Sequence, residues 1–242
     1  MTIKEIASLC GVSVATISRV FNEPQKVNPQ TRQKVLEIAQ KYGYTPHAVA
    51  KSLRTKRTGV FALTVMSGVE RVFEDSYAAK FLKGAVKYFS KHKLKLIVDV
   101  FTDGDVIDYY KNFVLSKLVD GFILMDLKDD DPRVELLNSM KFPFVCVGRN
   151  NKNNFVFVDS DNFFGGYQAG EHLKEIGCKS LLFVGGDPSL PFERERYAGF
   201  ETGLKGMDEN IVIFKEYAYY DDELVKRIVR KYIEKIDGIF CT

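Results

Sequence analysis

The stretch that most constrains this 242-residue chain is its beginning, residues 2–22, which read TIKEIASLCGVSVATISRVFN. Thr2 and Glu5 have the spacing of a capping box, in which each side chain accepts a hydrogen bond from the other residue's backbone N–H. Gly11 stands where a first helix must end, and Ser13 can cap a second one. The stretch therefore predicts two short helices joined by a tight turn.

A helix pair of this kind can place its second helix in the major groove of B-DNA, with side chains against the base edges. The apolar face of the second helix contains Ile17 and Val20. Its other side chains are short, polar or basic, as a groove-reading surface requires: Val14, Ala15, Ser18 and Arg19. A small helical hairpin without a DNA partner is the alternative interpretation.

A third helix follows and completes a small helical domain. Asn28-Pro29 is a strong helix start, and Gly43 is a suitable end. The three helices can close a small core that consists of Ile6, Leu9, Ile17, Val20, Val35 and Ile38. Residues 46–57 then form a short, basic segment with helical potential.

The stretch VNPQTRQKVLEIAQKYGYTPHAVAKSLRTKRTG follows residues 2–22, and together they resemble the DNA-binding headpiece and hinge of the LacI/GalR family of bacterial transcription regulators. The resemblance implies a homodimer on a pseudo-palindromic operator, with base contacts from Val14, Ala15 and Arg19. It implies phosphate contacts from Thr2, Ser13, Thr16, Ser18 and Asn28.

The same resemblance implies a hinge helix that enters the minor groove and wedges Leu53 between base steps. The neighbouring hinge contacts would be His47, Ala50, Lys51 and Arg54, although the family more often has Asn or Ser at position 47. Isolated helices shorter than roughly 12 residues are marginal in water, so we expect the hinge to fold only on DNA against a second copy.

Charge is distributed unevenly along the chain. Residues 1–58 contain ten Lys and Arg against three Asp and Glu, which gives this part a net charge of +7. The rest of the chain contains 25 basic and 29 acidic residues and has a net charge of −4. A basic module on a mildly acidic body is typical of a DNA reader attached to a second domain. The scattered cysteines and the lack of a signal peptide or apolar span predict a cytoplasmic protein without a membrane segment.

From Gly59 onwards the pattern alternates between apolar strands and amphipathic helices. We expect strands at 60–66, 94–100, 122–125, 144–147, 155–158, 180–184, 211–214 and 238–241, with helices at 77–92, 106–118, 133–140, 163–176, 194–204 and 224–236. Strands that are apolar throughout indicate parallel sheets covered on both faces. The fold class is therefore an all-α headpiece followed by two Rossmann-like subdomains, with the ligand at the carboxyl ends of their strands.

Residues 119–125, 158–186, 194–205 and 237–242 resemble the effector-binding core of the same family, which is similar to periplasmic sugar-binding proteins. The family core normally continues beyond this point, so we expect the core to be incomplete at its C-terminus. The expected domains are a headpiece (1–45), a hinge and linker (46–58), an N-terminal subdomain (59–158) and a C-terminal subdomain (159–242).

Arg196 matches the family's ligand-binding arginine, and its guanidinium offers paired donors to hydroxyls or carboxylates. A surface salt bridge with Glu193 or Glu195 is the alternative. Further effector-binding residues expected by the resemblance or by their chemistry are Ser76, Tyr77, Arg149, Asp161, Phe192 and Tyr220. Asp161 could be only an N-cap, and Phe192 or Tyr220 could be only a core residue.

Catalysis finds little support in the sequence. There is no GxGxxG, phosphate-binding loop or nucleophile elbow, and the three histidines are far apart. We expect no metal and no cofactor, and we interpret residues 129–131 as a solvated acidic loop.

The prediction is a repressor whose operator affinity is controlled by a small molecule, most simply a sugar. A regulator that uses a corepressor, or that lacks ligand control, is the main alternative. A periplasmic-type sugar-binding protein or an enzyme is a further one.

Overall fold

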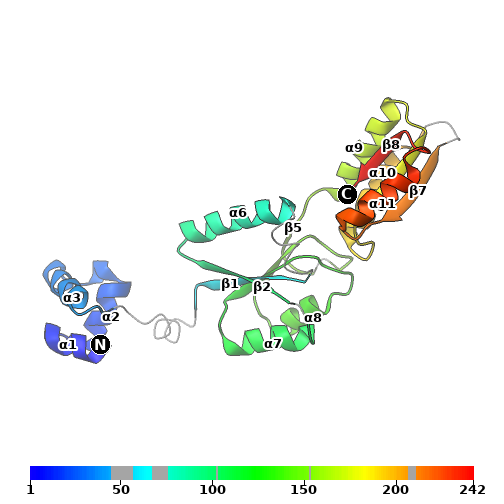
Figure 1. Ribbon diagram of the computed structural model, residues 1–242. Coiled ribbons are helices and arrows are strands. Elements are labelled where there is room, and N and C mark those ends of the chain that lie inside the picture. Colours follow the sequence, from blue (N-terminus) through cyan, green and yellow to red (C-terminus); the bar gives the residue numbers. More distant parts are fainter. Residues whose placement is uncertain (45–56, 67–75, 102, 153, 207–210) are drawn as a thin grey trace. The chain divides into compact units, whose positions relative to one another are not determined.

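The computed structural model describes residues 1–44, 57–66, 76–101, 103–152, 154–206 and 211–242. The chain divides into two compact units, Met1–Thr58 and Gly59–Thr242 (Figure 1). The predicted hinge helix lies outside the described residues, and with it the expected contacts of His47, Ala50, Lys51, Leu53 and Arg54.

The first unit contains the predicted helices. They are α1 (Ile3–Cys10), α2 (Val14–Asn22) and α3 (Pro29–Lys41), with a short 3₁₀ helix η1 (Pro24–Lys26) before α3. The capping box is confirmed, because the Thr2 N–H donates to Glu5 at 2.7 Å and the Glu5 N–H donates to Thr2 Oγ1 at 3.4 Å. Gly11 ends α1 with a left-handed φ of 64°.

The core of the first unit differs in part from the prediction. Leu9 was expected inside but is 47% exposed, because α1 buries the face that carries its other apolar residues. Tyr44 closes the core instead and makes an edge-to-face contact with Phe21. Ile38, which was also expected in the core, is only partly buried at its edge. The eight buried core residues are Ile6, Ala7, Cys10, Ile17, Val20, Val35, Ala39 and Tyr44.

The second unit begins with a five-stranded parallel sheet in the order β2-β1-β3-β4-β5. Its strands are β1 (Val60–Val65), β2 (Lys95–Val100), β3 (Gly121–Leu124), β4 (Phe144–Val147) and β5 (Phe157–Val158). Helix α6 covers one face, and α7 and α8 cover the other (Figure 1). These helices span Ser76–Lys91, Val106–Ser116 and Pro132–Ser139.

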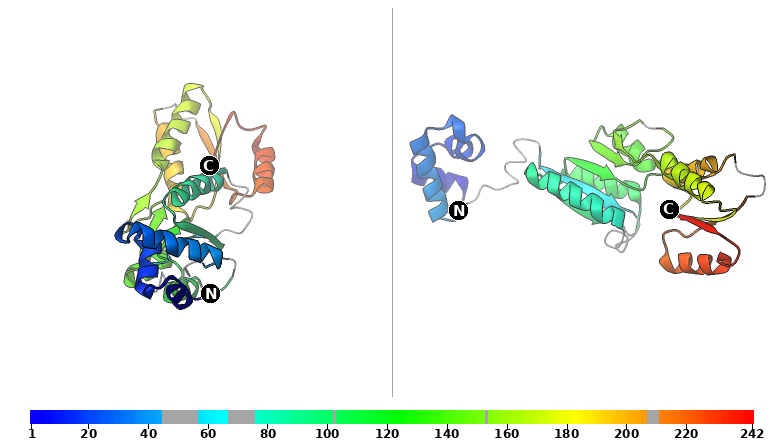
Figure 2. Two further views of the ribbon diagram at one scale, coloured as in Figure 1. Left: turned by 90° about the vertical axis from the view of Figure 1, so that its left-hand side faces the viewer. Right: turned by 90° about the horizontal axis from the view of Figure 1, so that it is seen from above.

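A second, three-stranded parallel sheet has the order β7-β6-β8. Its strands are β6 (Ser180–Gly185), β7 (Val212–Tyr217) and β8 (Gly238–Cys241), and its helices are α9 (Asn162–Glu175), α10 (Pro191–Gly203) and α11 (Asp222–Tyr232). Both views in Figure 2 show α11 apart from the α9–α10 pair. The two faces of β6 pack accordingly, with Phe183 towards α10 and Leu182 towards α11.

Helices α9 and α10 approach each other so closely that their interface has room only for glycine. A Cβ added to Gly199 would lie 1.9 Å from the carbonyl oxygen of Phe163, and one added to Gly166 would lie 2.0 Å from that of Arg196. Gly170 and Gly203 are enclosed in the same way. The first turn of α9 and the turns after it are thereby held against the part of α10 from Arg196 to Gly203.

The prediction that the acidic loop at 129–131 is solvated is wrong for one of its three residues, Asp131. Asp131 is 3% exposed and caps α8, and its carboxylate pairs with the equally buried Arg133 at 2.7 Å. Burial opposes ionisation of Asp131, but the hydrogen bonds and charge of Arg133 outweigh it and lower the pKa of this carboxyl. The prediction failed because the residue that buries and compensates Asp131 is not evident from the acidic run itself.

Substitution of Gly199 by alanine should separate α9 from α10. We expect Gly199→Ala to lower the free energy of unfolding by about 1–3 kcal/mol, the usual cost of overpacking a filled interface. Urea unfolding followed by circular dichroism measures the change. Gly165→Ala is the matched control on α9, since nothing lies within 4 Å of its added Cβ. Equal destabilisation by the two substitutions would contradict the proposed tight contact.

Candidate functional site

Helix α2 presents the expected base-reading residues on its outer face. Val14, Ala15 and Arg19 are exposed, and within the described residues the Arg19 guanidinium forms no hydrogen bond or ion pair. The helix is anchored from below by Ile17 and Val20, which are buried in the core of the first unit. A basic side chain is thus held on a rigid, exposed helix face.

Three residues expected to contact phosphates are the N-caps of the three helices. Thr2 caps α1, Ser13 caps α2 through the Thr16 N–H at 3.1 Å, and Asn28 caps α3 through the Gln30 N–H at 2.9 Å. Helix N-termini attract phosphate groups through their free N–H groups and dipole. Ser18 is half-buried, and its hydroxyl lies 3.4 Å from the side-chain amide of Asn22.

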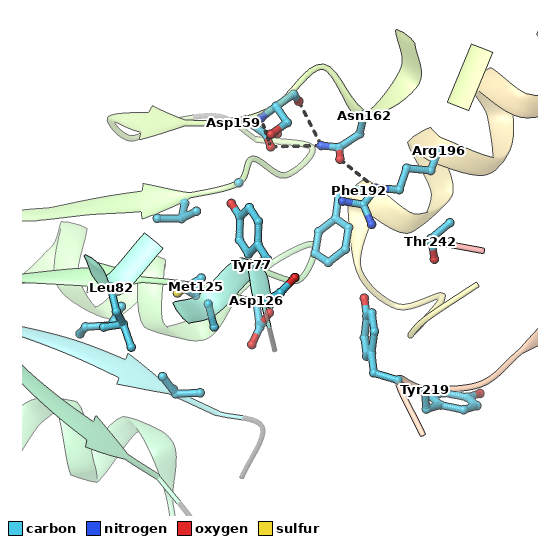
Figure 3. A pocket seen from close by; sticks show the side chains of 18 of the residues that line it. Tyr77, Leu82, Met125, Asp126, Asp159, Asn162, Phe192, Arg196, Tyr219 and Thr242 are labelled. Atoms are coloured by element: carbon cyan, nitrogen blue, oxygen red, sulfur yellow. Dashed lines mark hydrogen bonds between the residues drawn. The ribbon is translucent and has the colours of Figure 1, made fainter. Parts of the chain in front are cut away.

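A cavity of about 770 Å³ in the second unit lies at the carboxyl ends of strands from both sheets. Ligands of such parallel sheets bind at this edge. The cavity is lined by apolar, aromatic and charged side chains (Figure 3), namely Leu63, Val65, Ser76, Tyr77, Ala78, Leu82, Met125, Asp126, Val147, Gly148, Asp159, Ser160, Asn162, Phe192, Arg196, Tyr219, Tyr220, Asp222, Val225 and Thr242.

Arg196 is held in place on one wall of the cavity. Its Nε donates to Asn162 Oδ1 at 3.0 Å, its Nη1 lies 3.3 Å from Glu193 Oε1, and its guanidinium stacks 4.9 Å above the Phe192 ring. Asn162 is itself fixed, because its amide donates to Asp159 Oδ1 at 3.1 Å (Figure 3). Among the described residues Arg196 Nη2 has no hydrogen-bond partner, and it remains available to a ligand.

Two consecutive tyrosines, Tyr219 and Tyr220, form another part of the lining after β7. Both have left-handed backbone conformations, with φ of 50° and 63°. The Tyr220 hydroxyl donates to Glu193 at 2.8 Å, and its ring would clash at 2.2 Å with a Cβ on Gly186. Strained conformations of this kind persist where the surroundings fix them, and they concentrate at ligand sites.

The cavity brings together five of the seven expected effector residues, namely Ser76, Tyr77, Phe192, Arg196 and Tyr220. Arg149 and Asp161 are not among its lining residues. Arg149 donates to both carboxylate oxygens of Glu195, at 3.2 and 3.0 Å, and this hydrogen bonding raises its pKa. Asp161 caps α9 by accepting from the Phe164 N–H at 2.8 Å, in agreement with the alternative interpretation.

Several lining residues were missed from the sequence: Asp126, Asp159, Tyr219, Asp222 and Thr242. Asp126, Asp159 and Thr242 come within two residues of the ends of β3, β5 and β8. That position was the available signal, because the ends of parallel strands meet at one edge of a sheet. Glu193 was considered only as a surface partner of Arg196, but it is buried behind the cavity wall.

Neither a metal site nor a membrane-spanning helix is found in the part of the chain that the structure describes. No cluster of three or more His, Cys, Asp or Glu side chains there could hold a metal ion. No helix there has the length and apolar character needed to cross a membrane.

Comparison with known proteins finds a family model that matches the first unit and relatives that match nearly the whole chain. Residues 2–47 match the family model described as bacterial regulatory proteins, lacI family. Catabolite control protein A of Staphylococcus xylosus is 32% identical over 226 residues, which cover 91% of this chain and 68% of that protein. The transcriptional regulator MalR of Streptococcus pneumoniae is 26% identical over 98% of this chain and 72% of its own length.

Solved structures show the same fold. The lac repressor dimer bound to operator and the anti-inducer ONPF matches with a TM-score of 0.83 and 18% identity, over 100% of this chain and 73% of that one. The complex of the transcriptional regulator CelR with cellobiose matches with a TM-score of 0.66 and 24% identity, over 100% and 74%. With the helix-turn-helix unit and the parallel α/β core described above, these matches show that the chain belongs to the lacI family of bacterial transcription regulators.

Proposed function

We propose that this protein is a sugar-responsive repressor. Helix α2 reads an operator in the major groove, and the cavity at the carboxyl ends of the two sheets binds the sugar. Two copies bind a pseudo-palindromic operator, and the protein acts in the cytoplasm, where the DNA is, without carrying out catalysis. The proposed division is a headpiece (1–45), a hinge (46–58) and two subdomains (59–158 and 159–242).

The observation that carries the sugar assignment is the mixed chemistry of the cavity. Phe192, Tyr77 and Tyr219 supply aromatic faces on which the C–H side of a sugar ring can pack. Arg196 and Asn162 supply fixed polar groups for hydroxyls on the same wall. Aromatic and apolar side chains beside well-oriented polar groups are typical of small-molecule specificity sites.

The names of relatives support the same ligand class. The CelR structure is a complex with cellobiose, and MalR is a name shared by a Streptococcus pneumoniae relative and by a probable maltose operon repressor from Staphylococcus. We therefore choose maltose and cellobiose as the first probes. Sugar binding that strengthens operator binding, rather than weakening it, would make the sugar a corepressor.

The DNA assignment predicts a specific loss for Arg19→Ala. A base-reading arginine contributes about 1–3 kcal/mol to discrimination between sites, so operator preference should fall by that amount while binding to unrelated duplex changes little. The operator comes from selection of bound duplexes out of a random pool, and fluorescence anisotropy at fixed salt gives the affinities. Lys41→Ala, which removes the same charge from α3, is the control. Equal losses on operator and unrelated DNA would rule out base reading by Arg19.

The effector assignment predicts that Arg196→Ala weakens sugar binding. Hydrogen bonds from a charged group contribute about 1.5–3 kcal/mol, so the affinity should fall by roughly tenfold or more. Isothermal titration with maltose and cellobiose measures it. Arg194→Ala is the matched control, because Arg194 lies on the same helix, pairs with Asp129 and does not line the cavity. The sugar assignment is wrong if the unaltered protein binds neither disaccharide, or if both variants lose affinity equally.

A further inference from the structure

A fully buried carboxylate, Glu193, lies directly behind the cavity wall. Its side chain is 0% exposed, and it is not among the lining residues. It accepts hydrogen bonds from Thr242 Oγ1 at 2.6 Å, Tyr220 Oη at 2.8 Å, the Gly186 N–H at 3.0 Å and Arg196 Nη1 at 3.3 Å. Three of these four partners line the cavity, so one hidden side chain connects much of its polar wall.

Both oxygens of Glu193 face a group that can only donate. Oε1 faces the Arg196 guanidinium, and Oε2 faces the Gly186 backbone N–H. An ionised carboxylate is a pure acceptor and fits this arrangement. Within the described residues, the only ion pair of either Glu193 or Arg196 is the one they form together. The buried negative charge of Glu193 needs a partner of opposite charge, and Arg196 supplies it. In turn, Glu193 compensates the positive charge of Arg196 from behind the cavity wall.

The remaining charges that line the cavity are negative. Among the described residues, Arg196 is the only Lys or Arg in the lining, which also contains Asp126, Asp159 and Asp222. Asp159 is offset in part by Arg149 at 3.7 Å. Because Glu193 already balances Arg196, an anionic group in the cavity would face an excess of carboxylates, and the described lining residues include no unbalanced Lys or Arg to receive it. Uncharged hydroxyls can still accept from the guanidinium and donate to the carboxylates.

We propose that Glu193 is the positioning residue that sets the charge selectivity of the cavity. It orients Arg196 as a hydrogen-bond donor while cancelling its charge, so the site takes an uncharged polyhydroxylated ligand and rejects its phosphorylated form. This proposal deepens the sugar assignment above and rests on it.

The backbone around Glu193 supports a specific positioning role. Tyr220 has a left-handed φ of 63°, and its ring packs where a side chain at Gly186 would have to lie. The hydrogen bond from its hydroxyl to Glu193 ties this strained turn to the same carboxylate that holds Arg196. Glu193 therefore fixes an aromatic wall and a polar donor relative to each other.

The test compares the wild type, Glu193→Gln and Glu201→Gln by isothermal titration. The probes are maltose, cellobiose, the 6′-phosphate of each and inorganic phosphate. Glu201→Gln is the matched control: it removes the same charge from the same helix, but Glu201 contacts Tyr197, and neither residue lines the cavity. Thermal melting of each variant confirms that it is folded.

We expect the wild type to bind an uncharged disaccharide at least about tenfold more tightly than its 6′-phosphate, which is the scale of one charge-assisted hydrogen bond. Glu193→Gln should shift this ratio about tenfold towards the phosphorylated form, and Glu201→Gln should leave it unchanged. Equal wild-type affinity for the two forms overturns the proposal, as does an equal shift in both variants. If Glu193→Gln does not fold, the wild-type ratio decides.

Inorganic phosphate separates failure of this proposal from failure of the sugar assignment. If the wild type binds neither disaccharide, the sugar assignment fails, but charge compensation can still be tested. Phosphate binding that appears in Glu193→Gln, is absent from the wild type and is lost again when Arg196→Gln is added supports the compensation. Phosphate binding by the wild type, or no gain in Glu193→Gln, overturns it.

Discussion

The contact between α9 and α10 is the constraint on which the cavity wall depends. Glycines at 166, 170, 199 and 203 let the two backbones approach until carbonyl oxygens occupy the space of side chains. Asn162 begins α9 and Arg196 lies in the second turn of α10, so this approach brings the amide within 3.0 Å of the guanidinium. A larger residue at any of these glycines would separate the helices and, with them, the two polar groups that a ligand would meet.

The parallel sheets supply the rest of the cavity by bringing their carboxyl ends to one place. Strands β1, β3 and β4 end in Val65, Leu124 and Val147, and the lining begins at or next to each of these ends. β8 ends next to Thr242, which contributes from the opposite sheet. Residues from Leu63 to Thr242 therefore share one cavity, although nearly the whole second unit separates them in sequence.

The first unit is built differently, from short-range signals. Within residues 1–44 each of the three α-helices begins with a side-chain cap, and the same residues supply a core of eight side chains. Local capping fixes where each helix begins, and the buried stripe of α2 leaves Arg19 on the outside. This explains why the described helices and the exposure of Arg19 could be predicted closely, whereas the core was correct only in part, with Leu9 exposed.

The sequence by itself determined the order and type of the elements, because caps, turns and apolar periodicity act over a few residues. The strands at 144–147 and 238–241 have the predicted bounds, and Arg196 lies in the cavity as expected. Only the tertiary structure decided which charges are buried. Glu193 receives its shortest hydrogen bond from Thr242, 49 residues away. The charge partner of Asp131, Arg133, is only two residues away, but nothing in the local sequence shows that both side chains are buried. Burial of a charge depends on partners that folding brings together from distant parts of the chain, and local patterns carry no record of them.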